Sequence, residues 1–575
     1  MEGRSTKTYH AVIGNSWEVL YLKVYAIIKH TAVGLVRAIK FRTTHTVIRY
    51  HSYKIEQMKK IALITFIIFL GLRLNVYSQK QSFSLSAKVK IDPEVEEHFH
   101  QEGRMYLFIS ENLSIEPRTQ SWPNPNSKTY IFAKNIDRFD LTTGLYIKND
   151  DNWISTSGWT LDAVPKGEYN VQILWDQDTK ESRINAPGNL YSEKQRIIID
   201  QSIELDIVLS KTIKAHSVTI HDLSRVVEFK SEVLSNWWNN PIYLKASILL
   251  PHGYDSEKAY PIRYNVAGYG GRYTRINRLL DDEGFMKWWD SDEAPQIITV
   301  FLDGEGPFGD SYQMDSDNSG PYGRALITEF IPTIELKYRG TSSSSTRFVD
   351  GCSTGGWVSL GLQLYYPDFF NGAYSYSPDA VEFENYQLIN IYKDKNAFVN
   401  EYGYTRPVMR STTGEPMLSL KEFIQYENVL GSSNSYLNSG GQFSAHTALY
   451  SPKGSNGLPQ ALFDPMTGEI DSVVAQHWKK YDFKIYAQEN WEELGPKLQG
   501  KIFIWMGDMD NFYLNSATRE FADYLRETSN PNSDAEIIFS PMEGHCSQYS
   551  HKSVLQRIQE RIEKNDENKT NGNKK

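Results

Sequence analysis

Short strand-like segments follow one another from residue 79 to about residue 212. In the clearest, 83–91, every second residue is apolar and the residues between are polar or charged. Similar runs at 105–109, 169–175 and 203–209 are separated by clusters of Pro, Gly, Asn and Asp, without convincing helical stretches. A period of two is typical of strands with one buried face. Residues 79–212 are therefore predicted to form an antiparallel β-sandwich domain.

From residue 213 onward, strand-like segments alternate with helix-like ones. This alternation predicts an α/β domain over 213–563, with a mostly parallel sheet covered by helices on both faces. Residues 378–499 interrupt it with a segment rich in Tyr, Asn and Gly, which is too long for a simple loop and is predicted to be an inserted lid. The polar tail 564–575 is predicted to be disordered. The expected strands are 243–250, 263–267, 297–302, 347–350, 373–377, 501–506 and 536–540, and the expected helices are 324–338, 357–366 and 517–528.

A secretory signal pattern lies at 58–78. Met58 opens a two-lysine segment, an apolar run covers 61–72, and Val76 and Ser78 occupy the positions that favour cleavage. The apolar run is too short for a comfortable membrane span, and no cysteine follows it to carry a lipid. We therefore expect a signal peptide at 58–78 and a mature chain that begins near residue 79, exported to the periplasm or secreted, without a stable membrane anchor.

Residues 1–57 precede that signal and would prevent it from being read as one. We expect them to be an upstream extension translated from a wrong start. The alternative keeps them as a basic segment in front of a signal anchor.

The charge distribution limits the classes of possible partners. The chain has a formal charge of −9, but residues 1–78 hold twelve Lys and Arg against three Asp and Glu, which leaves −18 for the rest. An acidic body argues against a nucleic-acid partner. Aromatic residues make up 13 % of the chain. They would suit stacking on sugars or phenolic rings, although aromatic side chains more often pack in cores.

The sharpest motif is Gly-Cys-Ser-Thr-Gly-Gly at 351–356, between an expected strand and an expected helix. A strand-to-helix elbow holds its serine in a strained turn with the hydroxyl exposed, and small neighbours allow the backbones to cross closely. Ser353 is therefore the candidate nucleophile. The alternative is an ordinary glycine-rich turn before a helix.

Two loops after later strands offer the acid and the base in the order that elbow enzymes use. His545 stands in the terminal position of that order, although it could also be a solvent-bonded loop residue, and its nearby rival His551 lies further into a helical stretch. A neutral histidine can take the serine proton, while a buried carboxylate fixes its orientation. We favour Asp510 over Asp508 as that carboxylate, because Asp510 lies deeper in its loop and Asp508 could merely shape the turn.

Acyl chemistry also needs hydrogen-bond donors for an oxyanion. One is the amide of Thr354, directly after the nucleophile. The other is expected from the Gly-Tyr-Gly-Gly loop at 268–271, where we choose the amide of Tyr269; the alternative is a plain turn. The segment 315–320 faintly resembles a calcium loop, but Leu326 stands where a bidentate acid is needed. No metal and no cofactor is expected.

The only two cysteines, Cys352 and Cys546, are immediate neighbours of Ser353 and His545. Serine and histidine must approach within hydrogen-bond reach, so their neighbours should also approach, and an exported protein meets oxidising conditions. A disulfide between them is therefore expected. The alternative is two small buried thiols that only pack.

The stretch 242–271, headed by Tyr-Leu-Lys-Ala-Ser-Ile-Leu-Leu-Pro-His-Gly-Tyr, resembles the opening of the putative-esterase family of α/β-hydrolases. Enterochelin esterases, feruloyl esterases and S-formylglutathione hydrolases belong to it. Ser-Gly-Pro-Tyr-Gly at 319–323, Lys-Tyr-Arg at 337–339, Trp357 after the elbow and Gly-Asp-Met-Asp at 507–510 are similar to an enterochelin-esterase-like branch. The resemblance covers roughly 215–560.

This resemblance implies an α/β-hydrolase fold with an inserted lid, preceded by the β-sandwich that members of the branch commonly carry. It also implies a triad of Ser353, Asp510 and His545, the same residues chosen from the loops. The flanking cysteines are similar to those of tannases and fungal feruloyl esterases, in which a disulfide joins the neighbours of serine and histidine. This chain departs from those enzymes in its β-rich N-terminal region and its shorter insertion.

The sequence therefore predicts an exported serine esterase that hydrolyses carboxylic esters through an acyl-enzyme, acting on a small-molecule or glycan-linked ester with carbohydrate or phenolic groups. Two alternatives stay open. An acyltransferase on the same fold would pass the acyl group to an acceptor hydroxyl instead of water. A non-catalytic carbohydrate-binding protein would bind a glycan without turning over any ester.

Overall fold

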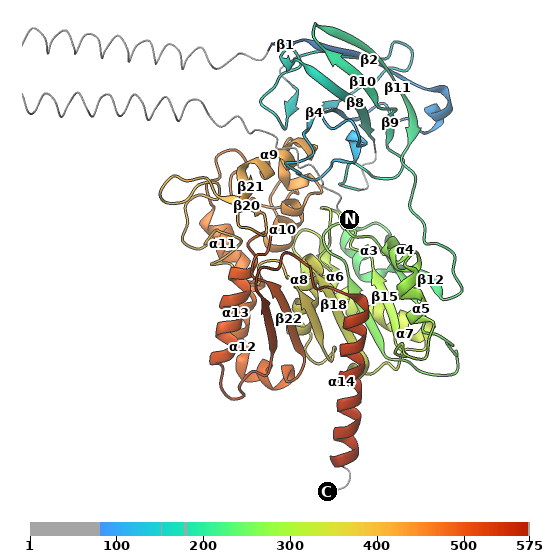
Figure 1. The fold of residues 1–575 in the computed structure, drawn as a ribbon, viewed down its shortest axis with the longest axis vertical. Coiled ribbons are helices and arrows are strands. Elements are labelled where there is room, and N and C mark those ends of the chain that lie inside the picture. Colours follow the sequence, from blue (N-terminus) through green and yellow to red (C-terminus); the bar gives the residue numbers. More distant parts are fainter. Residues whose placement is uncertain (1–80, 151, 178–180, 573–575) are drawn as a thin grey trace, which may run out of the picture. The chain divides into compact units, whose positions relative to one another are not determined.

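The computed structural model describes residues 81–150, 152–177 and 181–572 and contains two large sheets (Figure 1). The expected upstream extension (1–57) and signal peptide (58–78) lie outside these residues. The described residues from Gln81 onward belong to one compact unit. Contacts between the two sheets and their loops are therefore contacts within that unit.

The N-terminal sheet has nine strands in the order β5-β2-β11-β9-β8-β3-β4-β6, with β10 paired to β8. Its strands follow the predicted alternation, since Leu85, Ala87 and Val89 of β2 are buried and the residues between them are more exposed. A separate pair joins β1 (Ser82–Phe83) to β7 (Val164–Pro165). The nine strands are β2 (Leu85–Ile91), β3 (Gly103–Ser110), β4 (Thr129–Ile136), β5 (Leu145–Ile147), β6 (Ile154–Ser155), β8 (Gly167–Asp176), β9 (Leu190–Ser192), β10 (Gln195–Ile199) and β11 (Ile203–Thr212).

Buried side chains from both halves of this sheet, including those of β2 and β11 on one side and β3 and β8 on the other, share one hydrophobic cluster, as in a sandwich. The expectation of a wholly antiparallel arrangement is wrong for one pair. Strands β2 and β11 run parallel, with Leu85 opposite Ile203 and Ile91 opposite Leu209. Parallel neighbours need a long crossover, which β3 to β10 supply. Alternation determines the buried face of a strand but not the direction of its neighbour.

The second sheet has eight strands in the order β12-β13-β15-β14-β18-β19-β22-β23. Strand β13 is antiparallel to β12 and β15, and all later pairs are parallel. The central strands are buried along their whole length, as expected for strands covered on both faces. The eight strands are β12 (Ser224–Ser231), β13 (Ile242–Leu249), β14 (Ile262–Val266), β15 (Ile298–Leu302), β18 (Arg347–Cys352), β19 (Ala373–Tyr376), β22 (Ile502–Gly507) and β23 (Glu536–Ser540).

Helices cover both faces of this sheet (Figure 1). On one face, Trp357 of α8 stacks on Phe483 of α12 with ring centroids 4.5 Å apart. On the other, Val554 and Ile558 of α14 pack in the same cluster as Phe503 of β22. The strand order and the two helical layers confirm the α/β-hydrolase fold. The helices are α3 (Glu232–Trp238), α4 (Asn277–Leu280), α5 (Glu283–Trp289), α6 (Tyr322–Ala325), the π-helical segment η4 (Leu326–Phe330), α7 (Ile331–Tyr338), α8 (Thr354–Tyr365), α12 (Phe483–Leu498), α13 (Asn515–Glu527) and α14 (His551–Gly572).

Between β19 and β22 the chain forms the strand pair β20 (Pro407–Arg410) and β21 (Pro416–Ser419), followed by α9 (Leu420–Leu430), α10 (Gln442–Tyr450), α11 (Ser472–Trp478) and α12. Helix α9 begins with a capping box, in which Ser419 and Glu422 satisfy each other's backbone amides. Because α12 packs on α8, the last part of the segment 378–499 belongs to the helical layer of the sheet.

The inserted helix α9 also packs against the N-terminal sheet. Tyr426, Val429 and Leu430 share a hydrophobic cluster with Tyr106 and Phe108 of β3. The Tyr106 hydroxyl donates a hydrogen bond to the Leu430 carbonyl, with 2.5 Å between the oxygens. The insertion is thus held by both sheets and does not stand free as a flap.

Helix α14 continues through the segment expected to be disordered from residue 564 as far as Gly572. No helix in the described part of the chain has both the length and the apolar composition needed to cross a membrane.

Candidate functional site

Ser353 lies in a sharp turn between β18 and α8, with φ 61° and ψ −127°. This backbone conformation is strained for a residue other than glycine. The turn presses the start of α8 against β14, because a Cβ at Gly355 would lie 2.3 Å from the Val266 carbonyl oxygen and one at Gly351 would lie 2.5 Å from it. Only glycine fits at both positions. The elbow geometry expected from the motif is present.

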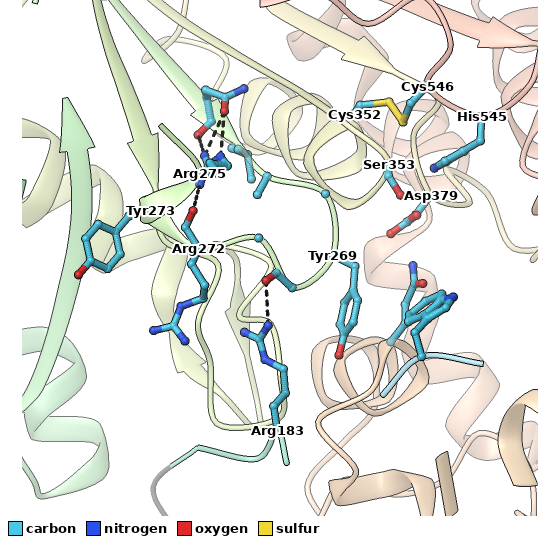
Figure 2. Close-up of a pocket in the computed structure, with 18 of the residues that line it drawn as sticks. Arg183, Tyr269, Arg272, Tyr273, Arg275, Cys352, Ser353, Asp379, His545 and Cys546 are labelled. Carbon is cyan, nitrogen blue, oxygen red and sulfur yellow. Dashed lines mark hydrogen bonds between the residues drawn. A yellow bond between two sulfur atoms is a disulfide. The ribbon is translucent and has the colours of Figure 1, made fainter. Parts of the chain in front are cut away.

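His545 and Asp510 lie in the loops that follow the last two strands of the sheet. Nδ1 of His545 and Oδ2 of Asp510 are 2.6 Å apart, and the Asp510 side chain is fully buried. The other Asp510 oxygen accepts hydrogen bonds from the amides of Phe512 (2.9 Å) and Leu514 (3.3 Å). Asp510 therefore fixes the imidazole through Nδ1. Figure 2 shows His545 beside Ser353 in the pocket.

The alternative residues have other partners. Asp508 forms an ion pair with Arg519 of α13. His551 is bonded through Nδ1 to a guanidinium nitrogen of Arg263 at 2.9 Å. The structure thus brings together Ser353, His545 and Asp510 and leaves Asp508 and His551 outside this arrangement.

The pKa of His545 lies above its ordinary value. Burial of the ring disfavours the charged form, but the charge and hydrogen bond of Asp510, together with the charge of Asp379, outweigh it. These carboxylates stabilise the imidazolium form of His545, the form that a general base reaches when it takes a proton.

We expect kcat/KM for an uncharged ester to rise with pH, with a midpoint above about 6.5, the usual pKa of histidine. Only neutral His545 can accept the serine proton, so activity is lost as pH falls through its raised pKa. A pH profile of kcat/KM between about pH 5 and about pH 9 measures this. An acidic limb centred below the usual histidine value would contradict the assignment.

The two expected oxyanion donors lie beside Ser353. Thr354 is the first residue of α8, and a first helical amide has no acceptor inside its helix. In the loop after β14, the Gly271 amide is bonded to the Gly268 carbonyl (3.0 Å) and the Gly270 amide to Asp310 Oδ2 (3.2 Å). These bonds occupy the loop's other two amides after residue 268, and the choice of the Tyr269 amide as an oxyanion donor stays a prediction.

Cys352 and Cys546 form a disulfide with their Cα atoms 6.0 Å apart. It joins the end of β18 to the loop that carries His545, across 194 positions of sequence. The alternative of two packed thiols is therefore wrong. The Cys546 amide also donates a hydrogen bond to the Ser377 hydroxyl (3.1 Å).

Reduction of this disulfide is expected to lower stability and activity. By the chain-entropy model, a cross-link over 194 positions stabilises the fold by at most about 5 kcal/mol. Activity should fall before the fold is lost, because the loop that holds His545 loosens first. Activity and near-ultraviolet circular dichroism measured together along a reductant titration test this, with a Cys352→Ala/Cys546→Ala variant as control. Unchanged activity after full reduction would limit the bond to chain stability.

A buried ion pair reinforces the same junction. Arg263 of β14 donates two hydrogen bonds to Asp350 of β18, at 2.8 and 2.7 Å, and both side chains are fully buried. The Tyr549 hydroxyl, four residues after His545, donates to Asp350 at 2.8 Å. The loop carrying His545 is thus tied to the nucleophile strand by a disulfide and by a charged hydrogen-bond network.

The site lies in a cavity of about 1100 Å³. Its wall includes residues that the sequence analysis missed. Trp122 and Arg183 come from loops of the N-terminal domain, and Asp379 follows β19. Arg183 donates a hydrogen bond to the Gly270 carbonyl (2.8 Å), in the loop of Tyr269 (Figure 2). Of these three residues, only Asp379 could have been found from the sequence, because it is a carboxylate just after a buried parallel strand.

The segment with a faint calcium pattern forms the hairpin of β16 (Asp315–Ser316) and β17 (Gly320–Pro321). Asp315 accepts a hydrogen bond from the Arg324 amide, and Asp317 pairs with His477 and Lys480. In the described ranges, no three His, Cys, Asp or Glu side chains gather as ligands for a metal ion.

Comparisons with known proteins follow the α/β domain. Residues 242–557 match the family model described as putative esterase. No curated protein matches the chain.

Solved structures similar to this chain include three hydrolases, each covering 59 % of it. A ferulic acid esterase is 18 % identical over 98 % of its own length, with a TM-score of 0.37. A fluorophosphonate-binding serine hydrolase from Staphylococcus aureus is 14 % identical over 98 % of its length, with a TM-score of 0.33. An S-formylglutathione hydrolase from Agrobacterium tumefaciens is 11 % identical over 94 % of its length, with a TM-score of 0.33.

Proposed function

This chain belongs to the putative esterase family of carboxylic-ester hydrolases, and from that premise we propose that it is an exported serine esterase that works through an acyl-enzyme. The observation that carries the proposal is one cavity holding the strained Ser353 and an imidazole bonded to the buried Asp510. A glycan-binding protein without turnover would have no use for this arrangement.

In the proposed reaction, His545 Nε2 takes the proton of Ser353 as the serine oxygen attacks the ester carbonyl. The amides of Thr354 and Tyr269 hold the resulting oxyanion. Collapse breaks the carbon–oxygen bond of the ester, and the leaving alcohol receives the proton from His545. Water, deprotonated by the same imidazole, then attacks the acyl-serine and releases the acid and free Ser353.

The cavity wall favours a substrate with a flat ring. Trp122 packs edge-on against Phe423 (5.0 Å between centroids) and lies 5.6 Å from the ring of Tyr269. Aromatic faces of this kind accept phenolic rings and the apolar faces of sugars. The name of one similar structure, a ferulic acid esterase, agrees with a phenolic acyl group. We therefore include phenolic and carbohydrate-linked esters in the proposal.

Export is the remaining part of the proposal. The disulfide between Cys352 and Cys546 and the membrane finding for the described helices are compatible with it. The signal pattern at 58–78 supplies the route. N-terminal sequencing of protein from its host should begin near residue 79, and a product that retains residues 1–57 would contradict the expectation.

The deciding experiment is turnover by the purified mature chain on acetyl, aryl and feruloyl esters, with Ser353→Ala as the control. Hydrolysis that disappears in the control supports the proposal. Sugar acceptors added to the same assay separate hydrolysis from acyl transfer, because transfer yields a new sugar ester in place of free acid. Turnover that survives Ser353→Ala, or the absence of any turnover, would overturn it.

A further inference from the structure

Asp379 is a second carboxylate in the catalytic cavity. It follows β19, which lies between the strand of Ser353 and the strand that leads to Asp510. Its side chain is 3 % exposed, yet it lines the same cavity as Ser353 and His545. Figure 2 shows Asp379 beside Ser353 on the cavity side.

The two oxygens of this carboxylate have different surroundings. Oδ2 accepts hydrogen bonds from the Tyr312 hydroxyl (2.8 Å) and the Thr354 hydroxyl (2.9 Å), and lies 3.4 Å from Nε2 of His446. Oδ1 receives no hydrogen bond from the residues that the structure describes, and it is not among the fully enclosed polar atoms. One oxygen is therefore anchored, and the other is open to the cavity.

The anchoring also keeps the group charged. Burial opposes ionisation, but the hydrogen bond and charge of His446 and the two hydroxyl donors outweigh it, so the pKa of Asp379 lies below its ordinary value. An anion whose second oxygen is open to the cavity offers a charged acceptor to a donor group of a ligand. The neighbours of Asp379 hold that acceptor in place before a substrate arrives.

The position of Asp379 indicates which part of a substrate it meets. Asp379 lines the same cavity as His545, whose imidazole must protonate the leaving alcohol. Its anchor Thr354 also carries the amide that is proposed to hold the oxyanion. A group attached next to the ester oxygen on the alcohol side would therefore reach Oδ1.

We propose that Oδ1 of Asp379 accepts a hydrogen bond from a hydroxyl adjacent to the scissile ester, so that the enzyme selects esters of polyhydroxylated alcohols such as sugars. This inference rests on the proposed esterase function. It adds a substrate-binding residue outside the triad and assigns the polar end of the substrate to the alcohol.

The test compares 2-hydroxyethyl and 2-methoxyethyl esters of one acyl group, in which a methyl group replaces the donor hydrogen. Wild-type kcat/KM should favour the hydroxyethyl ester about ten- to hundredfold, the usual worth of a hydrogen bond to a charged group. Asp379→Ala should reduce that ratio to near one while the methoxyethyl ester is still hydrolysed. A choline ester, which carries a charge but no donor, should gain nothing from Asp379.

The matched control is Asp482→Ala. Asp482 is also buried and accepts a hydrogen bond from a tyrosine hydroxyl, that of Tyr392 at 3.0 Å, but it does not line the cavity. Its variant should keep the wild-type ratio. Thermal unfolding of both variants shows whether either change disturbs the fold.

The other possible results separate a failure of the esterase function from a failure of the role proposed for Asp379. If the wild type hydrolyses neither ester nor any member of the ester panel, the esterase function itself fails. If the wild type hydrolyses both esters equally, or if Asp379→Ala slows both by the same factor, Asp379 does not recognise the hydroxyl. The inference is then overturned, while the esterase function stands. A faster choline ester would assign the site to a cation instead.

Discussion

Ser353→Ala is expected to lower kcat for ester hydrolysis by roughly 10⁴- to 10⁶-fold, and His545→Ala by a similar factor. Without the hydroxyl no acyl-enzyme forms, and without the imidazole the hydroxyl keeps its proton. The double variant should be hardly slower than either single variant, because the two side chains act as one unit. Steady-state kinetics on one activated ester measure all three.

Folding must be checked beside these rates. The serine lies in a strained turn. Alanine adopts the same backbone conformation with similar strain but lacks the hydroxyl. The Ser353→Ala protein should therefore unfold at a temperature close to that of the wild type and should retain its disulfide. A variant with wild-type unfolding and activity within tenfold of the wild type would show that another nucleophile is used.

Asp510→Asn is expected to lower kcat by about 10⁴-fold, because an amide in place of the carboxylate favours the wrong imidazole tautomer. Asp508→Asn is the matched control, two positions earlier in the same loop. Its carboxylate pairs with Arg519 near the surface, and a pair of this kind contributes little to stability. We expect less than about a tenfold effect there. The reverse ranking would move the role of the acid to Asp508.

The residues of the expected triad could be found from sequence because each follows a strand of the parallel sheet. In such a sheet the carboxyl ends of neighbouring strands meet at one edge. The motif at 351–356 identifies the nucleophile, and the two late loops offer few alternatives. The pairing of Cys352 with Cys546 follows from the same reasoning, since their neighbours must meet.

The rest of the site depends on packing between distant segments. Trp122 and Arg183 reach the cavity only because the N-terminal domain lies against the loop of Tyr269. Neither residue belongs to a motif. The sequence pattern does not predict the inserted helices α9 and α10 either, because their contacts on both sides bury polar groups such as Glu427 and His446 and weaken the helical periodicity. Local patterns contain no information on such contacts.

The parallel pairing of β2 with β11 has a consequence for how the chain is made. The ribosome synthesises β2 long before β11. Until β11 has been synthesised, the edge of β2 that pairs with it has no partner. An unpaired strand edge with an apolar face is a template for association with other chains. Fragments that end before Ile203 therefore expose an unpaired edge of β2 that favours aggregation. Fragments that include Thr212 can pair this edge with β11. The shortest soluble N-terminal fragment should thus be one that contains all of β11.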